Sequence, residues 1–239
     1  MEALAPRIER RLTVLGEEYA LAEPQIGALR VLLDLLAEDV APTTVHDPAR
    51  AVDVHIADAL SGLSVESLRE AKVVADLGSG AGVPALVLAT ALPHAHVFAV
   101  ESVGRKGAFI ERAAEAMSLA NVTVVAARAE EWPGGVGRCD VVCARALAAL
   151  PVVLEYAAPL LRMGGTVVAW KGRVGPDEAA DGAAAAEVLG LGEAEVRRVE
   201  PFRGADDRTL HIYSKVMETP TRFPRRPGIA TKRPLSAKK

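Results

Sequence analysis

An aspartate, three glycines and a glutamate follow one another at a spacing that suits an adenosine-containing cofactor. Asp76 comes at the end of an apolar run, and Gly78, Gly80 and Gly82 fall within five residues, so the backbone can turn tightly without Cβ atoms in the way. Glu101 ends the next apolar run about twenty residues later, where a carboxylate can accept hydrogen bonds from both ribose hydroxyls. This pairing predicts a nucleotide cofactor at the ends of two strands.

The loop favours a cationic cofactor over a pyrophosphate. It lacks the G-x-G-x-x-G spacing, and Asp76 would repel an anion. A sulfonium with an aminoacyl group fits better, because Asp76 can face its cationic end while Ser79 and the glycines accommodate the methionine part. Two alternatives stay open: Asp76 could cap a helix or a turn, and Glu130, a candidate acceptor for an adenine amino group, could be a solvated surface residue.

The elements around these residues indicate a doubly wound, mostly parallel sheet. From residue 72, short β-branched runs alternate with helical segments, and ligands in such sheets bind beyond the carboxyl ends of the strands. We expect seven strands, the last two closing as an antiparallel pair: 72–77, 96–101, 122–127, 139–144, 166–171, 195–202 and 209–216. The expected helices between them are 83–92, 104–118, 148–162 ended by Gly164 and Gly165, and 176–189.

Three helices are expected before the sheet. Residues 2–40 predict two, with Pro24 opening the second, and Asp47 followed by Pro48 predicts the start of a third. The apolar faces of the second and third helices are Leu29, Leu32, Leu33, Leu36 and Val40, and Val52, Ile56, Leu60 and Leu63.

Charge is distributed unevenly along the 239 residues. Seven of the 28 basic residues follow residue 221, whereas all 31 acidic residues precede it. An acidic body with a basic tail predicts contact with a polyanion, although a tail kept basic for solubility is the alternative.

Other signals exclude several classes of protein. No apolar run is long enough to span a membrane, and the charged start "MEALAPRIERRL" does not resemble a signal peptide, so we expect a cytoplasmic protein. Cys139 and Cys143 lie in an apolar run without a four-ligand cluster of Cys and His around them. They predict buried free thiols and no metal site.

Several short motifs occur together in order. They are "DLGSGAGVP", "ESVGRKGAFI", "NVTVVAARAEE", "CDVVCARALAAL", "GGTVVAWKG" and "RFPRRPGIATKRPL". With these motifs the chain resembles the small-subunit ribosomal RNA methyltransferase G family, also called glucose-inhibited division protein B, over residues 50–236.

The resemblance implies a fold, a reaction and partners. The fold would be α/β, a Rossmann-like class I S-adenosylmethionine-dependent methyltransferase, with a helical extension at 1–70, the methyltransferase domain at 71–218 and a basic tail at 219–239. The reaction would be methylation of N7 of one guanine in 16S rRNA, with S-adenosyl-L-methionine as cofactor and the small ribosomal subunit as context. The enzyme would act as a monomer, without a membrane or a metal.

The resemblance also implies roles for residues. The family's cofactor positions fall on Gly78 and Val83 at the loop, Glu101 at the ribose, and Ala129 and Glu130 at the adenine. Arg145 would lie near the reacting centre, where a structural salt bridge is the alternative role. Candidate contacts to RNA are Arg105, Lys106, Arg145, Lys171, Arg208, Arg222, Arg225, Arg226, Lys232 and Arg233. This chain departs from the family pattern at Ala59, at Ala85 and at 42–44, which reads "PTT" instead of "NLT".

Guanine N7 carries no proton and exposes its lone pair on the Hoogsteen edge, so its methylation needs no general base. We therefore expect no catalytic cysteine, and no role beyond packing or surface for the five histidines. Three competing functions remain: a small-molecule methyltransferase, a dinucleotide-binding protein, and a non-catalytic RNA-binding protein of similar fold.

Overall fold

The structure of the protein is a computed structural model that describes residues 5–237. Residues 2–4 of the first expected helix, and the basic residues Lys238 and Lys239, lie outside the described residues.

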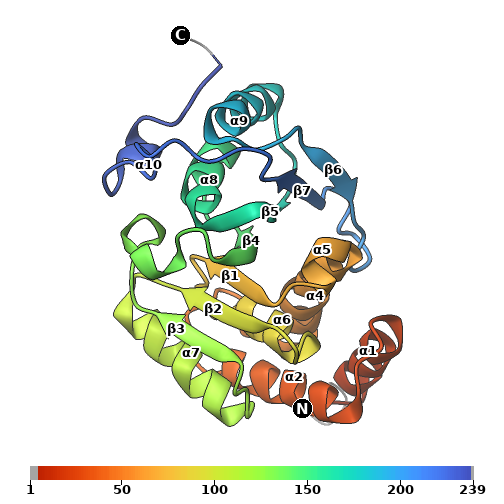
Figure 1. The fold of residues 1–239 in the computed structure, drawn as a ribbon. Coiled ribbons are helices and arrows are strands. Elements are labelled where there is room, and N and C mark those ends of the chain that lie inside the picture. Colours follow the sequence, from red (N-terminus) through yellow and green to blue (C-terminus); the bar gives the residue numbers. More distant parts are fainter. Residues whose placement is uncertain (1–4, 238–239) are drawn as a thin grey trace.

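One seven-stranded sheet forms the centre of the molecule, in the order β3-β2-β1-β4-β5-β7-β6 (Figure 1). β1 to β5 run parallel to one another, whereas β7 is antiparallel to both β5 and β6. The strands are β1 Val73–Leu77, β2 His96–Val100, β3 Val122–Val125, β4 Cys139–Arg145, β5 Leu161–Lys171, β6 Glu195–Arg198 and β7 Thr209–Ser214. The predicted doubly wound sheet with an antiparallel closing pair is confirmed.

Helices cover both faces of this sheet. They are α1 Ala5–Glu18, α2 Glu23–Leu36, α3 Pro48–Ala51, α4 Asp58–Leu60, α5 Glu66–Arg69, α6 Ala85–Ala91, α7 Gly104–Ala116, α8 Leu150–Ala157, α9 Pro176–Leu189 and α10 Ile229–Lys232. A π-helical segment, Val52–Ala57, joins α3 to α4. The third predicted helix is therefore continuous, but it changes from α-helical to π-helical and back. Its predicted apolar face is buried throughout, and Asp47 caps it by accepting a hydrogen bond from Ala49 N.

Two apolar cores result from the alternation of side chains along the strands. Val74 and Val97 point to one face and pack with the N-terminal helices, α6 and α7. Ala75 and Phe98 point to the other face and pack with α8 and α9. The helices before β1 therefore share a core with the sheet, and Cys139 and Cys143 are buried free thiols, as predicted.

Two local predictions are wrong. Val40 is 77% exposed, because α2 ends at Leu36 and the chain then leaves the helix axis. Gly164 and Gly165 do not end the helix, because α8 stops at Ala157 and both glycines lie inside β5. A Cβ on Gly165 would lie 2.9 Å from the carbonyl oxygen of Arg162 and 3.0 Å from that of Asp140, so this glycine permits close strand approach.

Candidate active site at the carboxyl edge of the sheet

The ends of β1 and β2 lie side by side and are joined by hydrogen bonds from the glycine loop. Gly78 N donates to Val100 O at 2.8 Å, and Gly80 N donates to the Glu101 carboxylate at 3.0 Å. The second carboxylate oxygen of Glu101 accepts from Val103 N at 2.8 Å, and the side chain is buried. The loop and the acidic residue therefore converge, as the sequence predicts.

The glycine at position 78 is needed for the open space in front of β1. Its φ is +66°, a conformation that disfavours a side chain. A Cβ there would also lie 2.6 Å from Cδ1 of Leu147, which lines the adjoining cavity. A larger residue would thus push a wall of the cavity inward.

Asp76 lies beneath the loop and is completely buried. One carboxylate oxygen accepts from Ala85 N, the first residue of α6, at 3.2 Å, so Asp76 takes the capping role that the sequence left open. Its other oxygen has no hydrogen-bond partner within residues 5–237. Burial raises the pKa of this carboxyl to about 6. Ser79 and Val83 are also buried in the loop.

A cavity of about 230 Å³ opens in front of these strand ends. Gly78 and Val100 from the strand ends line it, together with Ala129 and Glu130 and with Tyr156 from α8. Its surface combines apolar atoms with the Glu130 carboxylate, a hydrogen-bond acceptor, and such a lining suits the adenine and ribose of a nucleoside. The residues present therefore fit an adenosyl cofactor.

A second cavity, of about 350 Å³, adjoins the first, because Arg145 and Ala146 line this one while Leu147 and Ala148 line the other. Arg145 ends β4, and its guanidinium donates to Asp58 Oδ2 at 2.9 Å and to Val54 O at 2.8 Å. Asp58 is buried. The ion pair that the sequence left as an alternative role for Arg145 is thus present.

His55 also contacts Arg145, which revises the expectation that the histidines only pack or lie on the surface. Arg145 Nη2 can only donate, so the imidazole Nδ1 at 3.1 Å accepts, and Nε2 carries the proton toward Thr43 Oγ1 at 2.9 Å. Burial and the neighbouring guanidinium lower the pKa of His55 to about 4. His55 is therefore a neutral support of Arg145 at physiological pH.

The two other cationic side chains that line this pocket, Lys171 and Arg208, differ in how closely acidic residues hold them. Lys171 Nζ lies 2.7 Å from the Glu178 carboxylate and 3.1 Å from Ala148 O. Arg208 Nε lies 3.5 Å from Asp58 Oδ1, and its side chain is partly exposed. Trp170 is a core residue, since it is buried and its indole donates to Asp58 O at 2.8 Å.

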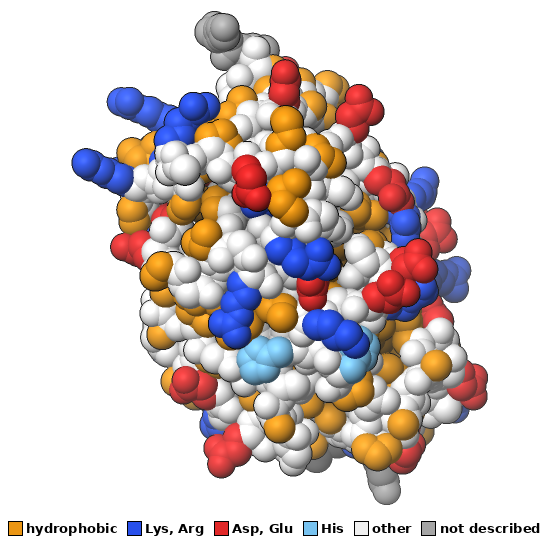
Figure 2. Space-filling view, in the orientation of Figure 1, with side chains coloured by type: hydrophobic (Ala, Val, Ile, Leu, Met, Phe, Trp, Pro, Cys, Tyr) orange, Lys and Arg blue, Asp and Glu red, His pale blue; other side chains and the backbone are white. Residues whose placement is uncertain are grey.

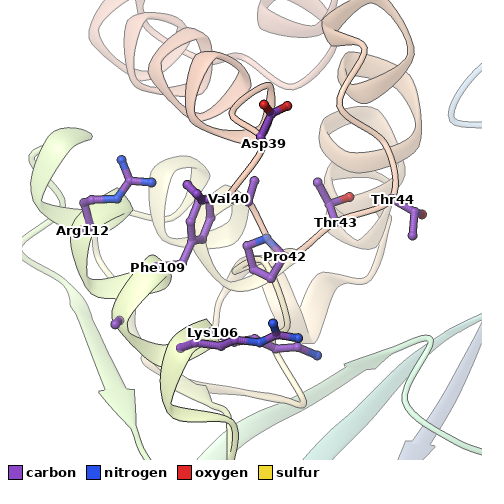
Figure 3. Close-up of a pocket in the computed structure, with 11 residues that line it drawn as sticks. Asp39, Val40, Pro42, Thr43, Thr44, Lys106, Phe109 and Arg112 are labelled. Atoms are coloured by element: carbon purple, nitrogen blue, oxygen red, sulfur yellow. The ribbon is translucent and has the colours of Figure 1, made fainter.

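A larger cavity than these two lies elsewhere. A groove of about 800 Å³ runs between the 39–44 segment and α7, and the predicted RNA contacts Arg105 and Lys106 line it. Figure 3 shows Lys106 and Phe109 facing this segment across the groove. The departure at 42–44 thus forms one wall of a basic groove, apart from the glycine loop.

The basic tail packs on the body of the protein. Arg225 forms a bidentate ion pair with the buried Glu155 and so anchors the tail to the body, while its contact to RNA stays a prediction. The other described basic residues of the tail are exposed: Arg222, Arg226, Lys232 and Arg233. Figure 2 shows basic side chains gathered near the middle of one face, and others projecting over α10.

Four residues of the site were missed by sequence reasoning. Asp58 and His55 lie three residues apart within a mostly apolar, buried segment. Two polar side chains in such a segment could have indicated a functional role. Tyr156 and Thr231, which reach the first cavity from α8 and α10, gave no comparable signal.

Within residues 5–237 we find no helix long and apolar enough to cross a membrane. The same residues contain no group of three or more His, Cys, Asp or Glu side chains arranged to hold a metal ion.

Solved structures with similar folds include methyltransferases. A SAM-dependent O-methyltransferase from Thermotoga maritima has a TM-score of 0.55 at 16% identity, covering 78% of this chain and 72% of that one. A predicted O-methyltransferase from Agrobacterium tumefaciens has a TM-score of 0.54 at 21% identity, covering 69% of this chain and 82% of that one. At these identities the likeness shows the fold alone.

Sequence relatives are much closer. Ribosomal RNA small subunit methyltransferase G of Rubrobacter xylanophilus is 39% identical, over 98% of this chain and 88% of the relative. The protein of the same name from Deinococcus radiodurans is 36% identical, over 98% of this chain and 95% of the relative. The family described as "rRNA small subunit methyltransferase G" matches residues 25–206. This chain therefore belongs to the ribosomal RNA small subunit methyltransferase G family.

Proposed function

We propose that this chain transfers a methyl group from S-adenosylmethionine to N7 of a guanine in 16S rRNA. The observation that carries the proposal is the 3.0 Å contact between Gly80 N and the Glu101 carboxylate, beside a pocket that holds Arg145. A cradle for an adenosyl group and a cationic pocket for a base adjoin at one edge of the sheet. The family membership supports the same reaction.

The cofactor residues are assigned by their positions around the smaller cavity. Glu101 would accept hydrogen bonds from the ribose hydroxyls, and Ala129 and Glu130 would contact the adenine. Gly78 leaves room for the methionine part, and Asp76 beneath the loop favours positive charge in front of it. S-adenosylmethionine bound in this way supplies an electrophilic methyl group.

The chain's contribution to the reaction is mainly positioning. Guanine N7 offers a lone pair and has no proton to lose, so no side chain has to act as a base. Alignment of the two reacting atoms in a site shielded from water can lower the barrier by several kcal/mol. The planar guanidinium of Arg145 suits the O6 edge of guanine, and Asp58 and His55 fix its orientation.

The substrate is rRNA, and we place it in the small ribosomal subunit, in the cytoplasm, with the enzyme acting as a monomer. A structured RNA must present an unstacked guanine, at a cost of a few kcal/mol when the base is flipped. Exposed basic residues, among them Arg105 and Arg226, can offset this cost through phosphate contacts that position the RNA without reading its sequence.

Mapping of 7-methylguanine in 16S rRNA tests the proposal. RNA from cells with and without this chain is treated so that it is cleaved at the methylated base. We expect one cleavage that disappears without the chain and returns with the wild-type protein, but not with the Glu101→Gln variant. An unchanged map would refute the rRNA assignment.

A further inference from the structure

The last described part of the chain, residues 219–237, forms a strap that is fastened to two helices. Thr219 Oγ1 donates to Leu189 O, the last residue of α9, at 3.0 Å. Arg225 clasps the Glu155 carboxylate on α8 with Nε at 2.8 Å and Nη2 at 2.5 Å. Near its end, Ser236 Oγ donates to Asp181 on α9 at 2.8 Å.

Between these fastenings the strap crosses the cavity assigned to the cofactor. Gly228 N donates to Glu130 Oε1 at 3.1 Å, and Thr231 Oγ1 lies 3.2 Å from the hydroxyl of Tyr156. Thr231 lines the cavity together with Glu130 and Tyr156, and the adjacent Ala230 is buried. Figure 1 shows α10 beside α8. The strap is therefore one wall of the cofactor site.

The outer side of the same strap is cationic. Arg222, Arg226, Lys232 and Arg233 are exposed, and no acidic residue follows residue 221. The basic side chains over α10 in Figure 2 project away from the body. One short segment thus carries a cofactor contact on its inner side and a site for phosphates on its outer side.

We propose that the strap couples cofactor retention to rRNA binding, with Glu155 as the positioning residue that holds it docked. The inference rests on the proposed function. A docked strap closes the cofactor cavity through Thr231 and Gly228, and it presents its exposed cations in a fixed arrangement. Because coupling between two ligands is reciprocal, RNA bound to the outer side must tighten cofactor binding by the same factor as the cofactor tightens RNA binding.

Glu155→Gln tests the docking, with S-adenosylhomocysteine as the probe in calorimetry. Glutamine keeps the shape but removes the charge that Arg225 pairs with. We expect about tenfold weaker binding, equivalent to the loss of one good hydrogen bond and its packing. Glu9→Gln is the matched control, because Glu9 forms a similar bidentate pair with Arg30 between α1 and α2, away from the cavity.

Gly228→Ala is a second variant that tests the same docking without touching a buried charge. Gly228 has φ of +77°, and a Cβ there would meet no atom within 4 Å, so the change strains only the turn that aims its N–H at Glu130. We expect severalfold weaker binding of the probe, with a melting temperature lowered by no more than about 4 °C.

The coupling is measured by repeating the titrations with small ribosomal subunits isolated from cells that lack this chain. We expect them to tighten binding of the probe at least about fivefold in the wild-type protein, and to have almost no effect in Glu155→Gln. Wild-type affinity in both strap variants, or equal tightening in the wild type and Glu155→Gln, would overturn the inference while leaving the proposed function intact. A wild-type protein that does not bind the probe would overturn both.

Discussion

The cavity that we propose for the cofactor and the Arg145 pocket adjoin, yet they are built in different ways. The first rests on the backbone of one loop and on Glu101, which lies at the end of the next strand. The second rests on side chains brought from distant segments, since Arg145 is held by Asp58 and His55, about ninety residues earlier in the chain. We infer that the two regions bind their ligands independently, apart from the coupling through the strap.

Glu101→Gln should give the largest difference between the two regions, because it weakens cofactor binding and leaves the Arg145 pocket unchanged. The variant weakens the acceptor for the ribose hydroxyls and for Gly80 N, so we expect S-adenosylhomocysteine affinity to fall about 100-fold, the loss of one or two charge-assisted hydrogen bonds. Calorimetry measures this loss, with the exposed Glu131→Gln as control. Binding of 16S rRNA, measured without the cofactor, should change by less than about twofold. Equal losses for both ligands would contradict the separation.

Arg145→Ala should affect the Arg145 pocket and leave the cavity proposed for the cofactor intact. It removes the main partner of the buried Asp58, so we expect the free energy of unfolding to fall by about 3 kcal/mol. Methyl transfer should be lost, while the folded variant still binds S-adenosylhomocysteine. Urea titration and calorimetry measure these effects. Arg162→Ala is the control, because its ion pair with Asp140 is more exposed and should contribute at most about 1 kcal/mol.

His55→Gln tests the support of the Arg145 pocket through the pH dependence of the free energy of unfolding. The folded-state pKa of His55, about 4, lies below the ordinary value of 6.5, so the neutral form is favoured by folding. Its stabilisation is complete above the unfolded pKa and is lost as pH falls from 6.5 toward 4. Between pH 6.5 and 5 we expect the wild type to lose on the order of 1 kcal/mol more than His55→Gln in urea titrations. Identical pH profiles would show that His55 does not support the pocket.

The smallest expected effect is a pH dependence of cofactor affinity that arises from Asp76. Its pKa is raised to about 6, and a cation bound above the loop would favour the ionised form. Affinity for the sulfonium of S-adenosylmethionine should therefore rise with pH through 6, severalfold more than affinity for neutral-sulfur S-adenosylhomocysteine. Asp76→Asn should abolish this difference. The same pH dependence for both ligands would place the sulfonium away from Asp76.

The sequence predicts the convergence of the glycine loop and Glu101 better than the surroundings of Arg145, for a physical reason. A glycine loop and an acidic residue at the next strand end are local patterns, and the parallel sheet brings adjacent strand ends together. The pairing of Asp58 with Arg145 depends on how a helical segment packs against β4, which local patterns do not specify. Arg225 illustrates the same limit, because charge alone does not distinguish an anchor to Glu155 from a contact to RNA.

A crystal structure with S-adenosylhomocysteine tests the central claim most directly. We predict its ribose hydroxyls within hydrogen-bonding distance of the Glu101 carboxylate, and its adenine between Ala129 and Thr231. The sulfur should point toward the Arg145 pocket. Ligand in the large groove beside Lys106, with an empty space in front of Gly78, would contradict the account.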